Sequence, residues 1–103
     1  MTEHDIQNSI RMKLSAQGYC VFRINTGKVK MADGRWFDTG VPKGFSDLIA
    51  IKGGKITFIE VKDATGRIRP AQKAFLQTMR ERYGCRAGIA RSVEDAICLC
   101  EGG

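Results

Sequence analysis

The feature that most constrains the fold is a pair of glycines between two apolar runs. In the segment SDLIAIKGGKITFIEVK, Gly53 and Gly54 separate the runs 48–51 and 56–61. A two-residue glycine loop between strand-forming segments is a strong β-hairpin signal, because glycine accepts the positive φ that tight hairpin turns require. The segment therefore predicts two adjacent antiparallel strands, around which the rest of the chain must be built.

The two-residue loop also predicts which residues face each other. With both glycines in the loop, Asp47 faces Glu60, and Lys62 projects from the same face because residues two apart on a strand share a face. Directly opposed like charges destabilise a sheet, so the two acids favour a cation between them, and their oxygens suit Mg²⁺ or Mn²⁺. The alternative is an ordinary ion pair at a strand end, and a bulge or longer loop would break the alignment.

The other face of the hairpin is apolar and carries Leu48, Ala50, Ile59 and Val61. Because both faces are largely apolar, we expect helices to cover both sides of the sheet. Periodicity and end signals predict further helices over residues 2–17, 70–83 and 92–100, and strands over 19–24 and 85–90. The expected order is α-β-β-β-α-β-α, which indicates one α/β domain with a mixed sheet.

Residues 25–43 form a polar segment punctuated by glycine, with a possible small hairpin around MADGRW. The segment is the natural candidate for a mobile loop. Its Trp36 and Phe37 could form a dimer contact, stack on DNA or belong to the core, and the sequence does not separate these three roles.

Composition excludes several classes of protein. Hydrophobic residues make up 43% of the 103 residues and charged residues 27%, as in soluble globular proteins. No apolar run is long enough to span a membrane, and the first residues do not resemble a signal peptide, so we expect a cytoplasmic protein. The four cysteines form no CxxC pair and the single histidine, His4, is remote from them, so we expect buried thiols rather than zinc ligands or disulfides.

Basic residues concentrate in one part of the chain. Residues 62–91 contain eight Lys or Arg against two acids, a local charge of +6, whereas residues 92–103 contain three acids and no base. A local basic excess is the pattern expected for a polyanion partner such as a nucleic acid, although a merely solvated basic face has the same composition.

Three segments between residues 44 and 72 together resemble a nuclease signature: GFSDLIAI, FIEVK and GRIRPAQ. They resemble the PD-(D/E)xK signature as written in the VRR-NUC family. Asp47 matches the separated acid, Glu60-Val61-Lys62 the E-x-K, and Gln72 the downstream glutamine. Ser46 replaces the proline of the pattern, at a position that is structural rather than a metal ligand.

The resemblance covers nearly the whole chain and implies a restriction-endonuclease-like α/β fold. Its αβββαβ core is a mixed central sheet flanked by helices, and residues 1–103 would form a single VRR-NUC nuclease domain. The small stand-alone members of the family that it resembles are phage-encoded, so a phage or bacterial source is implied as well.

The resemblance also implies an activity, Mg²⁺-dependent hydrolysis of DNA phosphodiesters, with Mn²⁺ able to substitute. Asp47, Glu60 and the backbone carbonyl of Val61 are the implied metal ligands. Lys62 would orient or deprotonate the attacking water, or neutralise the phosphate. Gln72 would reach back toward Lys62, the water or the backbone. The family also tends to place an acid on its first helix. The best match to that acid is Glu3, and the alternative is Asp5.

DNA is the implied partner, and four basic residues are the expected phosphate contacts: Lys43, Arg67, Arg69 and Lys73. Phosphate contacts position DNA without reading its sequence, and no recognition helix fits into the chain, so structure-selective cutting is expected. The similar phage nucleases act as homodimers, on four-way (Holliday) junctions in the junction-resolving cases. We therefore expect branched DNA, a homodimer, no membrane and no small-molecule cofactor.

Two alternatives to an active nuclease stay open. A DNA-binding module without activity would be expected to lack an acid or the lysine, yet Asp47, Glu60 and Lys62 are all present. A nuclease subunit targeted by a partner protein is disfavoured by the absence of a linker or tail. A nucleotide-binding protein is excluded, because Gly53 and Gly54 lie between strands rather than before a helix.

Overall fold

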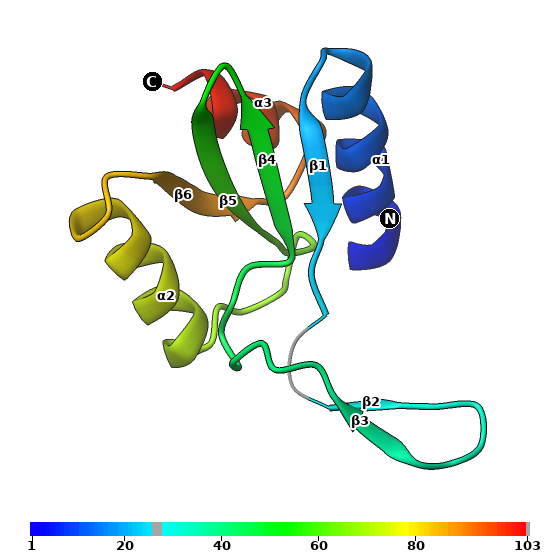
Figure 1. Cartoon of the computed structure of the whole chain (residues 1–103). Helices are drawn as coiled ribbons and strands as arrows, with labels where there is room; N and C mark the ends of the chain where they lie inside the picture. Colours follow the sequence, from blue (N-terminus) through cyan, green and yellow to red (C-terminus); the bar gives the residue numbers. More distant parts are fainter. Residues whose placement is uncertain (26–27, 103) are drawn as a thin grey trace.

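The computed structural model describes residues 1–25 and 28–102, which form helices and strands in the order expected from the sequence (Figure 1). The elements are α1 (Glu3–Ala16), β1 (Cys20–Arg23), β2 (Lys28–Lys30), β3 (Trp36–Asp38), β4 (Leu48–Lys52), β5 (Lys55–Val61), α2 (Pro70–Glu81), β6 (Arg86–Ala90) and α3 (Val93–Glu101). No helix in these ranges is both long and apolar enough to cross a membrane.

The central sheet has four strands in the order β1-β4-β5-β6. Strands β1, β4 and β5 pair antiparallel, and β5 pairs parallel with β6, so the sheet is mixed as expected. The pairs Ile49–Phe58 and Ile51–Ile56 confirm the hairpin register that the glycine pair predicts. The register brings the start of β4 beside the end of β5.

Side-chain caps determine where two of the helices begin. The Thr2 hydroxyl accepts a hydrogen bond from the Asp5 backbone N–H, and the Asp5 carboxylate accepts one from the Thr2 N–H, which completes a capping box at α1. At α3 the Ser92 hydroxyl accepts from the Asp95 N–H. The Asp95 carboxylate accepts from the Arg91 N–H instead of the Ser92 N–H, so only half of a capping box is formed there.

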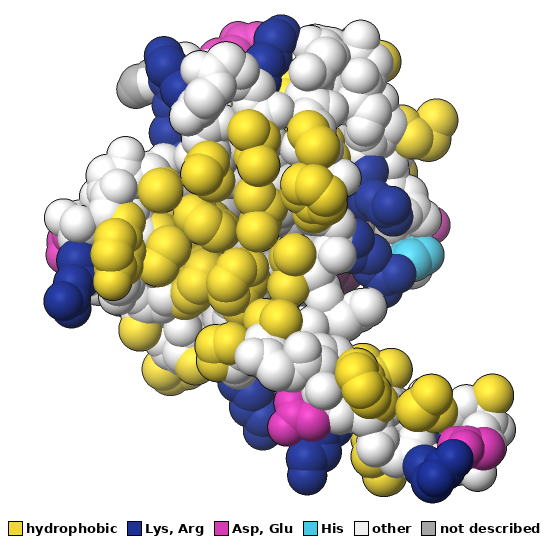
Figure 2. Space-filling view, viewed as in Figure 1, with side chains coloured by type: hydrophobic (Ala, Val, Ile, Leu, Met, Phe, Trp, Pro, Cys, Tyr) yellow, Lys and Arg dark blue, Asp and Glu magenta, His cyan; other side chains and the backbone are white. Residues whose placement is uncertain are grey.

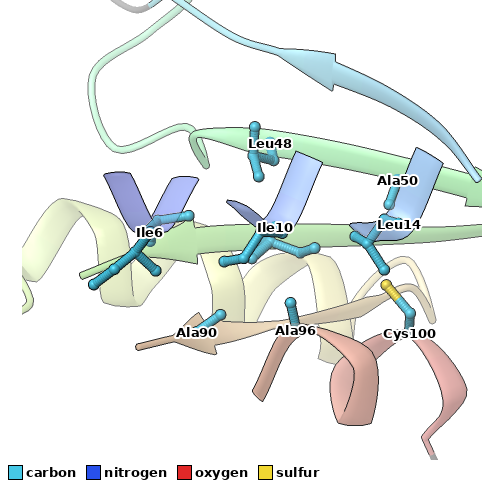
Figure 3. Packing of buried hydrophobic residues seen from close by; sticks show 10 residues of the cluster. Ile6, Ile10, Leu14, Leu48, Ala50, Ala90, Ala96 and Cys100 are labelled. Carbon is cyan, nitrogen blue, oxygen red and sulfur yellow. The ribbon is translucent and has the colours of Figure 1, made fainter. Parts of the chain in front are cut away.

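Helices α1 and α3 cover one face of the sheet and form the larger core (Figure 3). Its buried side chains come from both helices and from three strands: Ile6, Ile10, Leu14, Leu48, Ala50, Ile59, Val61, Ala90, Ala96 and Cys100. Burying this much apolar surface is the main contribution to the stability of the domain.

Helix α2 covers only part of the opposite face, because it packs mainly on β5 and β6, and its apolar cluster reaches β4 at Ile49. On the rest of that face Phe22 is 50% and Ile56 38% exposed, and Ile51 is partly buried. Figure 2 shows a broad apolar surface over the body of the molecule in this view. The expectation that helices cover both faces is therefore correct for one face and only half correct for the other.

The cysteines correct a second expectation. All four are free thiols, as expected, but only Cys100 is buried and Cys85 is partly buried. Cys20 and Cys98 are exposed. Cys20 lies on the edge strand β1, on the α2 side of the sheet but beyond the reach of that helix. Burial of a thiol depends on which neighbours cover it, and composition does not contain that information.

Gly44 brings the loop before β4 against the first turn of α2. Its φ is +91°, and a Cβ atom built there would lie 2.6 Å from the carbonyl oxygen of Ala71. A side chain would therefore meet both an unfavourable backbone conformation and fixed backbone atoms. The close approach connects the loop that carries Asp47 to the helix that carries Gln72.

The predicted hairpin around MADGRW is confirmed: β2 and β3 pair antiparallel, with Val29 opposite Phe37 and Lys30 opposite Trp36. The hairpin projects from the body of the molecule (Figure 1). Both aromatic residues are exposed, Trp36 by 64% and Phe37 by 56%, so neither belongs to the core. Residues 26–27 of the predicted mobile loop lie outside the described residues, and its mobility stays a prediction.

Candidate active site

The end of the β4–β5 hairpin remote from its turn gathers the polar side chains that the sequence singles out. Asp47 directly precedes β4, and its Oδ2 accepts a hydrogen bond of 2.9 Å from the backbone N–H of Val61. The Asp47 backbone carbonyl accepts a bond of 2.8 Å from the Ile24 N–H. These two bonds fix Asp47 between the strands and direct its carboxylate toward Glu60, the neighbour of Val61.

Glu60 is the most deeply buried charged side chain of the described residues, with 2% of its surface exposed. Its Oε2 accepts a 2.9 Å hydrogen bond from the Gln72 side chain and lies 3.7 Å from the Nζ of Lys62. Its Oε1 is buried and has no hydrogen-bond partner. An unpaired carboxylate oxygen in a protein interior is costly, so this atom marks a place where a ligand could bind.

Burial and the neighbouring Asp47 carboxylate raise the pKa of Glu60 to about 8, and the charge of Glu3 adds to this effect. Lys62 acts in the opposite direction but does not cancel it. Two acids in a desolvated site cannot both ionise without compensation. In the absence of a cation, the carboxyl of Glu60 therefore holds a proton near neutral pH.

Lys62 is held at the site by its backbone and by the turn that follows it. Its N–H donates to the Ala90 carbonyl of β6, and only 7% of the residue is exposed. A Cβ atom built at Gly66 would lie 3.3 Å from the Cδ of Lys62, so the turn packs directly on the lysine side chain. The ammonium group is thereby directed at the acids rather than at bulk solvent.

Gln72 lies in the first turn of α2 and contacts Glu60 rather than Lys62. Its Nε2 donates to Glu60, and its Oε1 accepts a 3.0 Å hydrogen bond from the Arg69 N–H. Both ends of the amide are therefore used, one to close the start of α2 and one to hold the carboxylate. Packing of Phe75 and Leu76 against Phe58 sets the rotation of α2 that makes this contact possible.

The first helix brings Glu3 nearer to the cluster than Asp5. Asp5 is exposed, and hydrogen bonds to Thr2 hold its pKa below the usual value, so its carboxylate belongs to the helix cap. Glu3 is partly buried and acts electrostatically on Glu60. Within residues 1–25 and 28–102, however, no three acids, histidines or cysteines approach closely enough to form a metal cage by themselves.

A cationic groove of about 650 Å³ lies beside the site, between the turn after β5, α2 and β6. Four basic residues line it: Arg67, Lys73, Arg80 and Arg91. Arg80 and Arg91 are anchored by hydrogen bonds to the backbone carbonyls of Ala87 and Asp63.

Arg80 and Arg91 were not among the site residues predicted from the sequence. Arg80 could have been found from its seven-residue spacing to Lys73, which places both on one helix face. Arg69 and Lys43 do not line the groove; Lys43 lines a separate hollow with Lys28 and Asp38 at the base of the β2–β3 hairpin.

The donor set fits a hard divalent cation. Asp47 and Glu60 supply carboxylate oxygens, one of which is buried without a partner. Mg²⁺ is commonly bound by only one or two carboxylates, with waters and substrate phosphate completing its coordination, so the lack of a third acid is compatible with it. The raised pKa of Glu60 also indicates a missing positive charge, since two carboxylates face each other and Lys62 alone does not compensate them.

A mixed sheet that ends in two acids and a lysine, beside a cationic groove, is the arrangement of a nuclease-like domain that acts on DNA. The family model described as the VRR-NUC domain matches residues 1–94. Because this match covers most of the chain, the protein belongs to the VRR-NUC family.

The other comparisons bear on the fold. A solved structure described as a VRR_NUC domain matches 98% of this chain and 97% of its own, with a TM-score of 0.68 and 23% sequence identity. At this identity the likeness establishes the fold, a mixed α/β structure with helices flanking the sheet. No curated protein matches the sequence.

Proposed function

We propose that this protein is a Mg²⁺-dependent, structure-selective DNA endonuclease that acts in the cytoplasm on branched DNA such as four-way junctions. The observation that carries the proposal is the buried Glu60 Oε1 without a partner, between a second acid and a lysine. A purely structural ion pair would use its oxygens within the protein. An oxygen left free at the end of a strand pair supports a role in binding a ligand.

In this proposal Asp47, Glu60 and the Val61 carbonyl hold the metal, with Glu3 as a further acid on the same side. The bound ion would polarise the scissile phosphate and help to generate the attacking hydroxide. Gln72 keeps Glu60 in one orientation through its hydrogen bond to Oε2. Lys62 provides a positive charge, which holds the attacking water or a phosphate oxygen as the bond to the leaving oxygen breaks.

The cationic groove is the proposed path of the DNA backbone. Arg67 and Lys73 line it together with the two arginines anchored to backbone carbonyls. Anchored guanidinium groups lose little side-chain entropy on binding phosphate, which favours affinity. Arg69 is exposed where α2 begins, and Lys43 is exposed near the hairpin, so both extend the basic surface outside the groove.

A homodimer is the proposed working form, and the open half of the sheet is its proposed contact. The exposed apolar side chains there are Phe22 and Ile56, beside the partly buried Ile49 and Ile51. The charged residues of β1 and β4, Arg23 and Lys52, lie on the opposite face of the sheet. A large uncharged apolar surface is typical of contacts between protein subunits. A two-fold contact would place two active sites on one assembly, as cutting two strands requires.

Phe22→Asp tests this contact, because it places a charge in the apolar surface at a residue that is already half exposed. We expect the wild type to have the mass of two chains in light scattering and the variant to have the mass of one. Met12→Asp is the matched control, since Met12 is 74% exposed on α1, on the other side of the sheet. A wild type that stays monomeric at high concentration would exclude the dimer.

Cleavage of labelled DNA tests the activity itself. A four-way junction, a fork, a flap, a linear duplex and a single strand are incubated with Mg²⁺, with Mn²⁺ and with EDTA at low salt. We expect cutting with either metal and none with EDTA, with branched substrates cut fastest. Tight binding without cutting under all metal conditions would instead support a DNA-binding module, and cutting that appears only with an added protein would support a targeted subunit.

A further inference from the structure

The β2–β3 hairpin forms an arm, residues 28–38, that starts at the same end of the sheet as the candidate site. The arm lengthens the molecule to 43 Å, against 30 and 29 Å along the other two axes (Figure 1). The backbone bond between Ile24 and Asp47 ties together the two chain segments that lead to and from the arm. DNA held at Asp47 would therefore pass beside the base of the arm.

The register of the arm gives it two different faces. Lys30 pairs with Trp36 and Lys28 pairs with Asp38, and residues two apart on a strand share a face, so these four side chains lie on one face of the arm. Val29 pairs with Phe37 on the opposite face. One face thus carries two lysines, one carboxylate and an indole, with a net positive charge, and the other face is apolar and uncharged.

Nothing in the described part of the chain covers the cationic face. Trp36 is 64% exposed, and both lysines are exposed. The tip is nevertheless well defined, because Asp33 accepts hydrogen bonds from the Arg35 backbone and side chain. A two-stranded ribbon of three residues per strand gains little stability of its own, so an exposed indole opposite a lysine is better explained by a binding role than by folding.

We propose that the Lys28–Lys30–Trp36 face of the arm binds base faces that are exposed at the branch point of the DNA substrate. The indole stacks on a base face that the branch leaves uncovered, while the two ammonium groups contact the neighbouring phosphates. Bases within a duplex are already stacked on each other, whereas a branch or single strand exposes base faces that an aromatic ring can cover. The inference rests on the proposed action on DNA and adds the element that selects branched substrates.

The single tryptophan of the chain makes a direct test possible, since Trp36 is the only source of indole fluorescence. Emission of the Glu60→Gln variant is recorded during titration with an unlabelled four-way junction and with a linear duplex of equal length. We expect strong quenching by the junction and weak quenching by the duplex. In anisotropy titrations Trp36→Ala should lower the ratio of junction to duplex affinity about tenfold, the effect of losing one base-stacking contact.

Phe37→Ala is the matched control, because it removes the adjacent aromatic ring from the other face of the arm, and it should keep the junction preference. Unchanged emission on DNA binding, or a junction preference that survives Trp36→Ala, overturns the inference. Emission that changes with protein concentration instead of DNA also overturns it, because the arm would then contact a second copy. If the junction quenches the emission but the wild-type protein cleaves no DNA, the result supports the proposed role of the arm and contradicts the proposed nuclease activity.

Discussion

Glu60→Gln is expected to abolish cleavage and, at the same time, to stabilise the protein at alkaline pH in the absence of metal. Loss of a metal-binding carboxylate removes several kcal/mol of transition-state stabilisation, which corresponds to a rate decrease of about a thousandfold or more. The stability of the variant at alkaline pH should increase, because the wild-type carboxylate must ionise there in a desolvated site that already contains Asp47.

The sign of the stability change follows from the pKa of Glu60, which is raised from 4.5 to about 8. Between these values the folded protein holds a proton that the unfolded chain has released, so the wild type loses stability as the pH rises through about 8. Glutamine does not titrate and therefore avoids this loss. One pKa unit corresponds to about 1.4 kcal/mol, and about 1 kcal/mol shifts the Tm of a domain of this size by 4–8 °C.

Thermal unfolding in EDTA measures this effect. At pH 9 the variant should unfold at least about 4 °C above the wild type, and at pH 4.5 the difference should disappear. Added Mg²⁺ should raise the Tm of the wild type only, because in the proposed site the ion binds the folded protein through this carboxylate. Glu81→Gln, on the exposed side of α2, is the control and should show none of these changes. A lower Tm of Glu60→Gln at pH 9 would show that Glu60 is a stabilising structural carboxylate.

Lys62→Met is expected to lower kcat by about a hundredfold to ten-thousandfold, with little change in KM. Methionine has a similar length to lysine and can fill the same buried space beneath Gly66, but it has no charge to hold the water or the phosphate. The lysine lies 3.7 Å from Glu60 and is nearly inaccessible, so its loss should have little effect on the encounter with DNA.

Lys73→Met provides the contrast, since Lys73 is exposed in the cationic groove. It should raise KM, leave kcat almost unchanged and reduce the salt dependence of DNA binding by about one unit. Single-turnover cleavage over a range of DNA and salt concentrations separates the two effects. If Lys62→Met raised KM and kept kcat, Lys62 would be a phosphate contact like Lys73.

The hairpin and the family signature were readable from the sequence because both depend on local spacing. A two-residue glycine loop fixes the register between β4 and β5, and continuing that register past Leu48 and Ile59 places Asp47 beside Glu60. In each case the interacting groups are close along the chain or are related by strand pairing that a short turn determines.

Contacts between elements distant in sequence were not readable. Gln72 contacts Glu60 because α2 is rotated by the packing of its aromatic and aliphatic residues on β5, and Arg91 reaches the turn after β5 from the end of β6. The exposure of Cys20 depends on the same placement of α2, which leaves β1 uncovered. None of these contacts has a signature in the spacing of residues.

The sequence by itself determined the pairing of β4 with β5, the charged cluster at the end of this pair and the family, because short-range spacing and side-chain chemistry are sufficient for these features. The tertiary structure alone decided that an oxygen of Glu60 is buried without a partner, that α2 leaves half of one sheet face open, and that Trp36 stands exposed on an arm. These features depend on how helices pack against the sheet and on which surfaces they exclude from water, and packing is a property of the whole chain.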